Sequence, residues 1–365
     1  MNKVVVAASA AALVLSTGAS TAQVQPALAL SVAAESSEMI WNAVATDRGR
    51  IFVAGPRWSG SRGPSLARID AEGKPQPYPD AAWNAWQPGS DNGAAFVNVN
   101  AIHLDGIGGL WVVDTGSPKF GGDPLPGGAK LIRIDLTTDK VDRIVPLGPD
   151  VALAGSYVDD IRFNRAHAYL TDAGRPGLIV LDVASGAVRR VLDGHPSVVA
   201  QPSRDIFLDG QPVRGPDGDL LRVNSDPLEV SPDGRWLYYG PLPGPWSRIE
   251  TRWLDDATLP SKDLATKVEP WADLPPVGGT AMDRNGDLYF TDLAANALRR
   301  RAPDGTITTL IQSPDLHWVD APFIDAERRI WLPVPQIDRA PMFQGGVGKT
   351  LWPIRLYTLP LGSDR

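Results

Sequence analysis

One pattern recurs six times along the 365-residue chain: a small or polar residue, a turn residue five positions later, and then a strand rich in aromatic or β-branched side chains. The copies begin at Asn42, Asn100, Asp159, Asp226, Gly278 and Asp320. The turn residues, here called anchors, are Asp47, Asp105, Asn164, Ser231, Asp283 and Asp325. Six copies of one supersecondary unit predict an all-β fold, a six-bladed β-propeller with four-stranded antiparallel blades.

The spacing of the copies indicates one propeller over residues 23–365. We expect blades at approximately 39–97, 98–156, 157–225, 226–277, 278–316 and 317–361. A four-stranded blade needs roughly 40–50 residues, so the longer repeats predict loop insertions. Apolar residues alternate in segment 27–34, which is predicted to close the last blade as its outer strand. The alternative is a leader segment with no place in the fold.

The start of the chain indicates export. Lys3 precedes an apolar run over residues 4–15, and small residues at 20–22 resemble a cleavage site, which predicts a signal peptide over residues 1–22. The apolar run is too short to span a bilayer, so no membrane association is expected after cleavage. We therefore expect a secreted or periplasmic protein.

Composition excludes several kinds of site and partner. The chain has no cysteine, which rules out disulfides and thiolate metal sites. A net charge of −7 without a basic stripe argues against nucleic acid as a partner. The segment 345–350 is similar to a phosphate-binding loop, but Phe343 stands where that loop requires glycine. Neither a nucleotide nor haem is expected, and oligomeric state is not readable from the sequence.

Four stretches resemble one known family. They are Pro56-Arg57-Trp58 with Gly63-Pro64-Ser65-Leu66, the run Leu110 to Gly116, the run Leu237 to Leu242, and Leu316 to Asp320 leading to Trp331. Together they resemble the yellow / major royal jelly protein family over nearly all of the mature chain. The resemblance implies a six-bladed propeller of the wider gluconolactonase/regucalcin-like superfamily. Insect members of the family include dopachrome-converting enzymes and nutritive glycoproteins, so the resemblance fixes the fold better than the chemistry.

The leading residues of the repeats are the candidate functional groups, because the starts of the innermost strands meet around one end of the axis. Asn and Asp oxygens suit Ca²⁺ or Mg²⁺. Similarity to superfamily lactonases implies Asn42, Asp159 and Asp226 as metal ligands and Asn100 as a substrate contact. The match is partial, since Asn42 falls where those enzymes have Glu and Asp159 where they have Asn. The alternative is that these side chains cap turns.

Outside the metal set, two pairs of residues are singled out. His317 and Asp320 are candidate catalytic groups, His317 as an acid/base that titrates near neutrality. An exposed loop histidine is the alternative. Trp83 and Trp86 lie outside the repeat pattern and are candidates for the lid of a substrate pocket. Packing between blades is the alternative for both.

The leading hypothesis is therefore a divalent-metal-assisted, lactonase-type hydrolase acting on a small molecule in an axial funnel. Two alternatives stay open. One is a protein that binds a small aromatic or amine ligand without turnover, and the other is a dopachrome-type isomerase. Whether the chain is an enzyme at all is left open at this stage.

Overall fold

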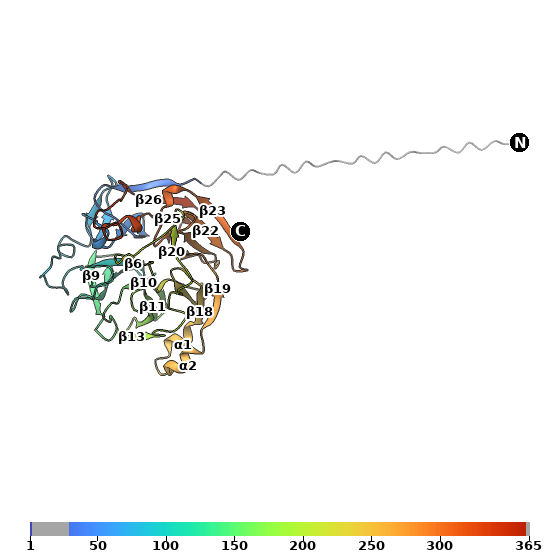
Figure 1. The fold of residues 1–365 in the computed structure, drawn as a ribbon, viewed down its shortest axis with the longest axis horizontal. Helices are drawn as coiled ribbons and strands as arrows, with labels where there is room; N and C mark the ends of the chain where they lie inside the picture. Colours follow the sequence, from blue (N-terminus) through green and yellow to red (C-terminus); the bar gives the residue numbers. More distant parts are fainter. Residues whose placement is uncertain (2–28, 363–365) are drawn as a thin grey trace.

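Six four-stranded antiparallel sheets surround a central axis in the computed structural model, which describes Met1 and residues 29–362 (Figure 1). In each sheet the strands run in order from the axis to the outside. This architecture confirms the predicted six-bladed β-propeller. The predicted signal peptide, residues 1–22, lies outside the described residues apart from Met1.

The first three blades follow chain order. Blade 1 contains β2 (Ala43–Asp47), β3 (Arg50–Ala54), β4 (Leu66–Ile69) and β5 (Pro75–Pro77). Blade 2 contains β6 (Val99–Leu104), β7 (Gly109–Asp114), β8 (Lys130–Asp135) and β9 (Lys140–Pro146). Blade 3 contains β10 (Val158–Asn164), β11 (His167–Asp172), β12 (Gly177–Asp182) and β13 (Val188–Val191).

The second half of the ring repeats this order and adds the closing strand. Blade 4 contains β16 (Ser225–Val230), β17 (Trp236–Pro241), β18 (Trp246–Glu250) and β19 (Glu269–Ala272). Blade 5 contains β20 (Val277–Met282), β21 (Leu288–Asp292), β22 (Ala297–Arg301) and β23 (Ile307–Gln312). Blade 6 contains β24 (Phe323–Ile324), β25 (Arg329–Pro333), β26 (Ile354–Pro360) and β1 (Ser31–Ser36).

The N-terminal strand closes the ring, as predicted. β1 pairs antiparallel with β26, so the outermost strand of blade 6 comes from the opposite end of the chain. The strand begins at Ser31, and residues 27 and 28 of the predicted segment lie outside the described residues. Pairing both ends of the chain in one sheet covers an edge that would otherwise expose unpaired backbone groups.

The anchors of blades 2 and 6 fix the turn between the first and second strands. In blade 2, Asp105 Oδ1 accepts hydrogen bonds from the backbone N–H of Ile107 and Gly109 at 2.9 and 2.8 Å. Its other carboxylate oxygen accepts from Trp111 Nε1 at 3.1 Å. Asp325 makes the same contacts to Arg329 N and Trp331 Nε1 in blade 6. In these two blades the anchor therefore closes the hairpin and holds an indole in the space between blades.

Insertions between and within blades supply the remaining elements. These are η1 (Arg57–Ser59), the hairpin β14 (Phe207–Leu208) with β15 (Gln211–Pro212), α1 (Thr251–Asp255), α2 (Ser261–Ala265), η2 (Pro314–Leu316), η3 (Ile337–Arg339) and η4 (Pro341–Phe343). None of the described helices is long and apolar enough to cross a membrane. Several insertions meet above one end of the axis, where they build the walls of a cavity.

Candidate functional site

The six leading residues of the repeats meet on the axis. All six line a cavity of about 300 Å³: Asn42, Asn100, Asp159, Asp226, Gly278 and Asp320. The same six border a much smaller space of about 10 Å³ on their other side. They therefore form the floor of the cavity, which we call the axial ring.

A break in strand register explains how four of these residues reach the axis. In β6, Val99 pairs with Asp114 and Ala101 with Val113, so Asn100 is an extra residue. Similar shifts fall at Asp159, Asp226 and Gly278, in the innermost strands of blades 3, 4 and 5. A β-bulge locally re-aims a side chain and is enriched beside active sites. The repeated bulge turns the leading side chains toward a common point.

Gly278 contributes no side chain to the ring because there is no room for one. A Cβ atom there would lie 2.3 Å from the carbonyl oxygen of Val319. That same oxygen accepts a hydrogen bond of 2.8 Å from Thr291 Oγ1 of blade 5. The glycine thus lets the backbone before Asp320 dock against blade 5, and this contact holds Asp320 at the ring.

A directed chain of hydrogen bonds leads from the wall of the cavity to Asp159. Trp58 Nε1 donates to the Tyr157 hydroxyl at 3.0 Å, and that hydroxyl donates to Asn100 Oδ1 at 2.7 Å. Asn100 Nδ2 then donates to Asp159 Oδ1 at 2.5 Å. An indole N–H can only donate, and in this arrangement the Tyr157 hydroxyl passes its own proton to Asn100 Oδ1, which leaves Nδ2 to face Asp159. The chain fixes the amide orientation of Asn100 and aims its N–H at the Asp159 carboxyl.

Three carboxyl groups share the ring, and each is shifted toward the protonated form. Burial, followed by the charge of Asp160, raises the pKa of Asp159 to about 7. Burial and the charge of Asp159 raise the pKa of Asp226 well above its usual value, and the same two causes act on Asp320. Like charges so close together disfavour full ionisation. The ring therefore favours a cation, or failing that bound protons.

Arg162, the cationic side chain on the same strand as Asp159, does not balance the charge of the axial ring. Arg162 of β10 pairs with Asp160 at 2.7 Å and with Glu229 at 2.8 Å. Thr280 also donates to Glu229, at 2.9 Å. Asp160, which follows Asp159 directly, thus belongs to a separate buried network rather than to the ring.

The oxygen atoms of the ring suit a hard divalent cation. Asn42 Oδ1 is buried and has no hydrogen-bond partner, and Asn42 lines the same small space as Asp159 and Asp226. Amide and carboxylate oxygens are the ligands that Ca²⁺ and Mg²⁺ prefer. No group of three or more His, Cys, Asp or Glu side chains within the described residues is arranged to hold a metal ion. A metal site here would depend on the Asn42 amide oxygen.

His317 lies away from the ring. Its Nε2 is 2.8 Å from Asp338 Oδ1 and its Nδ1 is 3.3 Å from Asp209 Oδ2. It does not line the axial cavity, whereas the next residue, Trp318, does. Trp318 adopts a left-handed backbone conformation with φ of 54°. The chain reverses there, with the indole facing the cavity and the imidazole facing a carboxylate pair outside it.

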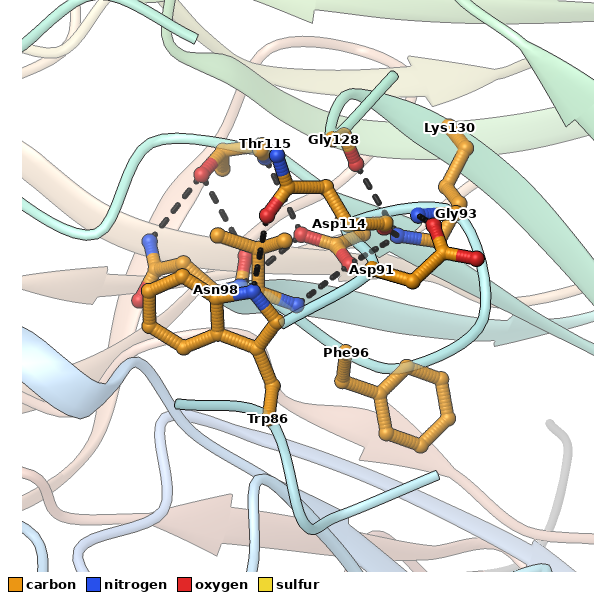
Figure 2. Close-up of polar contacts among 12 residues, drawn as sticks. Trp86, Asp91, Gly93, Phe96, Asn98, Asp114, Thr115, Gly128 and Lys130 are labelled. Atoms are coloured by element: carbon orange, nitrogen blue, oxygen red, sulfur yellow. Dashed lines mark hydrogen bonds and ion pairs between the residues drawn. The ribbon is translucent and has the colours of Figure 1, made fainter. Parts of the chain in front are cut away.

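Trp83 and Trp86 are not among the residues that line the cavity. Trp83 packs against Phe96, with ring centroids 5.1 Å apart. Trp86 is buried, and its Nε1 donates to Asn92 Oδ1 at 2.9 Å (Figure 2). Their positions match the packing alternative rather than a lid.

The walls of the cavity come mainly from residues that the sequence did not single out. They are Trp58, Phe120, Tyr157, Leu221, Arg222, Val223, Asn224, Leu242, Trp318, Ile337 and Phe343. Tyr157 could have been found, because it stands two positions before Asp159 and the strand period places both on one face. Trp58, Leu242 and Trp318 lie in the stretches that carry the family resemblance, but nothing in those stretches marks them as wall residues. Most of the others lie in insertions with no repeat.

The fold and the ring together define a class: a six-bladed propeller with one aromatic-walled cavity over a polar floor. Residues 97–331 match the family model described as "Major royal jelly protein". The match spans more than half of the chain, and the chain belongs to the major royal jelly protein family. No curated protein sequence matches it.

Several solved structures share the fold at low sequence identity. A calcium-binding protein, regucalcin, from Agrobacterium tumefaciens is 14% identical, with a TM-score of 0.51 over 90% of this chain and 93% of that one. Virginiamycin B lyase from Staphylococcus aureus is 13% identical, with a TM-score of 0.51 over 92% of this chain and 100% of that one. A luciferin-regenerating enzyme is 10% identical, with a TM-score of 0.54 over 92% and 96%. These likenesses concern the fold alone.

Proposed function

We propose that the axial ring holds a divalent cation and that the chain hydrolyses a small lactone or ester in the cavity above it. The observation that carries this proposal is the unpaired Asn42 Oδ1 beside three carboxyl groups whose pKa values are raised. A buried acceptor without a partner is costly, and crowded carboxyl groups repel one another. One cation would relieve both costs.

The proposed ligands are Asn42, Asp159 and Asp226, as the lactonase resemblance implies. A bound divalent cation would polarise the substrate carbonyl and favour ionisation of a nearby water. Asn100 supports the arrangement, because its amide N–H holds one oxygen of Asp159. The wall residues form an apolar surface around the space above the ring.

Asp320 is the proposed proton acceptor. It faces the cavity from blade 6, across the ring from Asp159 of blade 3, and burial raises the pKa of its carboxyl. A carboxylate with a raised pKa is a better base near neutrality than an ordinary exposed one. No role is assigned to His317, because it lies outside the cavity.

A second function, binding without turnover, is favoured by one specific observation. Trp58, Phe120 and Phe343 form part of a wall next to the carboxyl groups. Aromatic faces beside carboxylates also attract an organic cation such as a protonated amine. The binding of such a ligand without any lactone turnover would favour this second function.

The test begins with metal binding. We expect the purified protein, stripped with chelator, to bind about one Ca²⁺, Mg²⁺ or Mn²⁺ per chain by calorimetry, with Asp226→Asn weakening the affinity by ~10-fold or more. Asp273→Asn is the matched control, since that carboxylate is exposed and pairs with Arg204 away from the axial ring. Turnover of a lactone panel should require the ion and stop in chelator. Failure of the wild-type protein to bind any of the three ions would overturn the proposal.

A further inference from the structure

The walls of the axial cavity present apolar surfaces. Phe120 stands at their centre, with its ring centroid 5.1 Å from that of Trp58, 5.4 Å from that of Tyr157 and 5.6 Å from that of Phe343. Leu242, Trp318 and Ile337 belong to the same hydrophobic cluster. The insertions that carry these residues come from blades far apart in the chain. Their meeting point is therefore a built apolar chamber.

The polar side chains on the walls are already engaged with the protein. Trp58 Nε1 and the Tyr157 hydroxyl belong to the chain of hydrogen bonds that ends at Asp159. Asn224 donates to the carbonyl oxygens of Ala173 and Gly174 at 3.2 Å and accepts from Ala200 N at 3.1 Å.

Arg222 is engaged in the same way. Its Nη1 donates to the Arg204 carbonyl at 2.8 Å, and its Nη2 contacts Asp205 at 2.8 Å and the Pro202 carbonyl at 3.0 Å. Its charged end is thus turned toward the protein. Among the polar side chains that line the described cavity, those of the walls are therefore engaged with the protein, and the unpaired Asn42 Oδ1 lies at the ring.

This division of polarity selects between classes of ligand. A sugar-like molecule has hydroxyl groups around its whole body, and along these walls they would lose water without gaining partners. An apolar body has no hydrogen bonds to water to lose, and its transfer out of water is favourable. The size is also informative, because a dry cavity of ~150 Å³ accommodates one benzene ring. A cavity of about 300 Å³ has room for roughly twice that.

We propose that the ligand of the axial site has a flat, apolar body of about two fused rings and a single polar head that reaches the ring, so that the substrate is an aromatic lactone or ester and not a sugar lactone. The claim that this ligand is a substrate rests on the proposed function. As a statement about binding it rests only on the walls.

Two pairs of compounds test it. Coumarin and glucono-δ-lactam resist hydrolysis and report binding by calorimetry. Dihydrocoumarin and glucono-δ-lactone report turnover with the cation present. We expect coumarin to bind and the lactam to show no measurable heat, and we expect kcat/KM for dihydrocoumarin to exceed that for the sugar lactone by ~100-fold or more. Equal or better binding or turnover of the sugar compound would overturn the inference and leave the metal proposal standing.

Variants of Phe120 test whether coumarin binds against the wall of the cavity. Phe120→Ser should weaken coumarin binding by ~10-fold or more, because it removes the central ring of the chamber. Phe120→Leu keeps an apolar wall and should change the affinity by less than ~3-fold. Phe120→Leu should also leave the cation affinity unchanged, since an apolar side chain there still supports Trp58 and Tyr157, which begin the hydrogen-bond chain to Asp159. Unchanged coumarin affinity in Phe120→Ser would contradict the proposed ligand position. If coumarin binds but no cation does, the proposed function fails while the inference about ligand shape holds.

Discussion

The molecule holds two sets of buried aspartates that differ in how their charge is balanced. At the end of β7, Asp114 pairs with Lys130 Nζ at 2.8 Å and accepts from the backbone N–H of Val97 and Asn98 at 2.8 and 2.9 Å (Figure 2). At the end of β11, Asp172 pairs with Arg190 at 2.7 Å and accepts from Tyr157 N at 2.9 Å. These carboxylates are fully paired.

The axial carboxyl groups have no comparable balance. Asp159 accepts one amide N–H from Asn100, and the pKa values of Asp159, Asp226 and Asp320 are all raised. The paired set holds the backbone from which the axial set projects, since Asp172 fixes Tyr157 and Asp114 fixes Asn98. Aspartates therefore have two roles in this protein: the paired set stabilises the frame, and the axial set is available to bind a ligand.

The largest expected effect concerns the frame. Asp114→Asn should lower the free energy of unfolding by ~3–5 kcal/mol, because it leaves the Lys130 ammonium buried without its counter-charge. Urea denaturation followed by circular dichroism measures this loss.

Two further variants control for this prediction. The double variant Asp114→Asn/Lys130→Met should recover at least ~1 kcal/mol of that loss, and Asp273→Asn should stay within ~0.5 kcal/mol of wild type. A single variant as stable as wild type would mean that the ion pair does not hold the frame.

Removing the charge of an axial aspartate should change the free energy of unfolding in the opposite direction. In chelator at pH 8, Asp226→Asn should raise the free energy of unfolding by roughly 1–2 kcal/mol, because it removes a carboxylate that its neighbours repel. The pKa of Asp159 is raised to about 7 in the folded protein, so between about pH 4 and 7 the folded state binds more protons than the unfolded one. The stability due to these protons is present at low pH and is lost as the pH rises through 7.

The difference between Asp226→Asn and wild type should therefore be small at pH 5 and largest at pH 8. Denaturant midpoints at the two pH values measure it. A gain of the same size at both would show that the hydrogen bonds of the new amide, and not the loss of charge, separate the two proteins.

The sequence predicted the frame and the ring better than it predicted the walls. The repeat places Asn42, Asn100, Asp159, Asp226 and Asp320 at matching strand starts, and matching starts must lie around one axis. It did not reveal the bulges that turn four of the leading residues inward. Those bulges depend on pairing with the next strand, as Val99 with Asp114 illustrates.

The walls and the position of His317 could not be predicted for a different reason. Phe120, Leu221 and Phe343 come from insertions that share no pattern, and only the closed ring brings them together. His317 and Trp318 face different sides because of one left-handed residue, which no periodicity reports. Trp83 and Trp86 stood out as departures from the repeat, yet departure from a repeat does not distinguish a lid from packing.

A smaller effect concerns His103, which lies between the inner strands of blades 2 and 3 with its ring 6.2 Å from that of Phe163. Burial, followed by the charge of Arg162, lowers the pKa of His103 to about 4. The folded state then binds fewer protons than the unfolded state between about pH 4 and 6.5, so the contribution to stability is full above pH 6.5 and is lost as the pH falls.

Wild-type protein should lose on the order of 1–2 kcal/mol from this residue over that range, and His103→Gln should lack that component. Denaturant midpoints from pH 6.5 to 4.5 measure the slope, with both proteins also carrying Asp226→Asn to reduce the opposing titration at the ring. An identical slope in both would assign the acid sensitivity to other groups.

The smallest expected effect compares two tryptophans, one from each set. Trp86 belongs to the frame, since its partner Asn92 also accepts a hydrogen bond from Lys130 Nζ at 2.8 Å through its carbonyl. Trp58 belongs to the ring, because its indole N–H starts the chain that ends at Asp159.

Trp86→Phe should cost about 1 kcal/mol of stability and leave cation affinity within ~2-fold of wild type. Trp58→Phe should cost a similar amount but weaken cation affinity by ~3–10-fold, because Tyr157 and Asn100 lose the bond that fixes their orientation. Calorimetric titration of both variants separates the two roles, and equal cation affinities would mean that the hydrogen-bond chain does not position the ring.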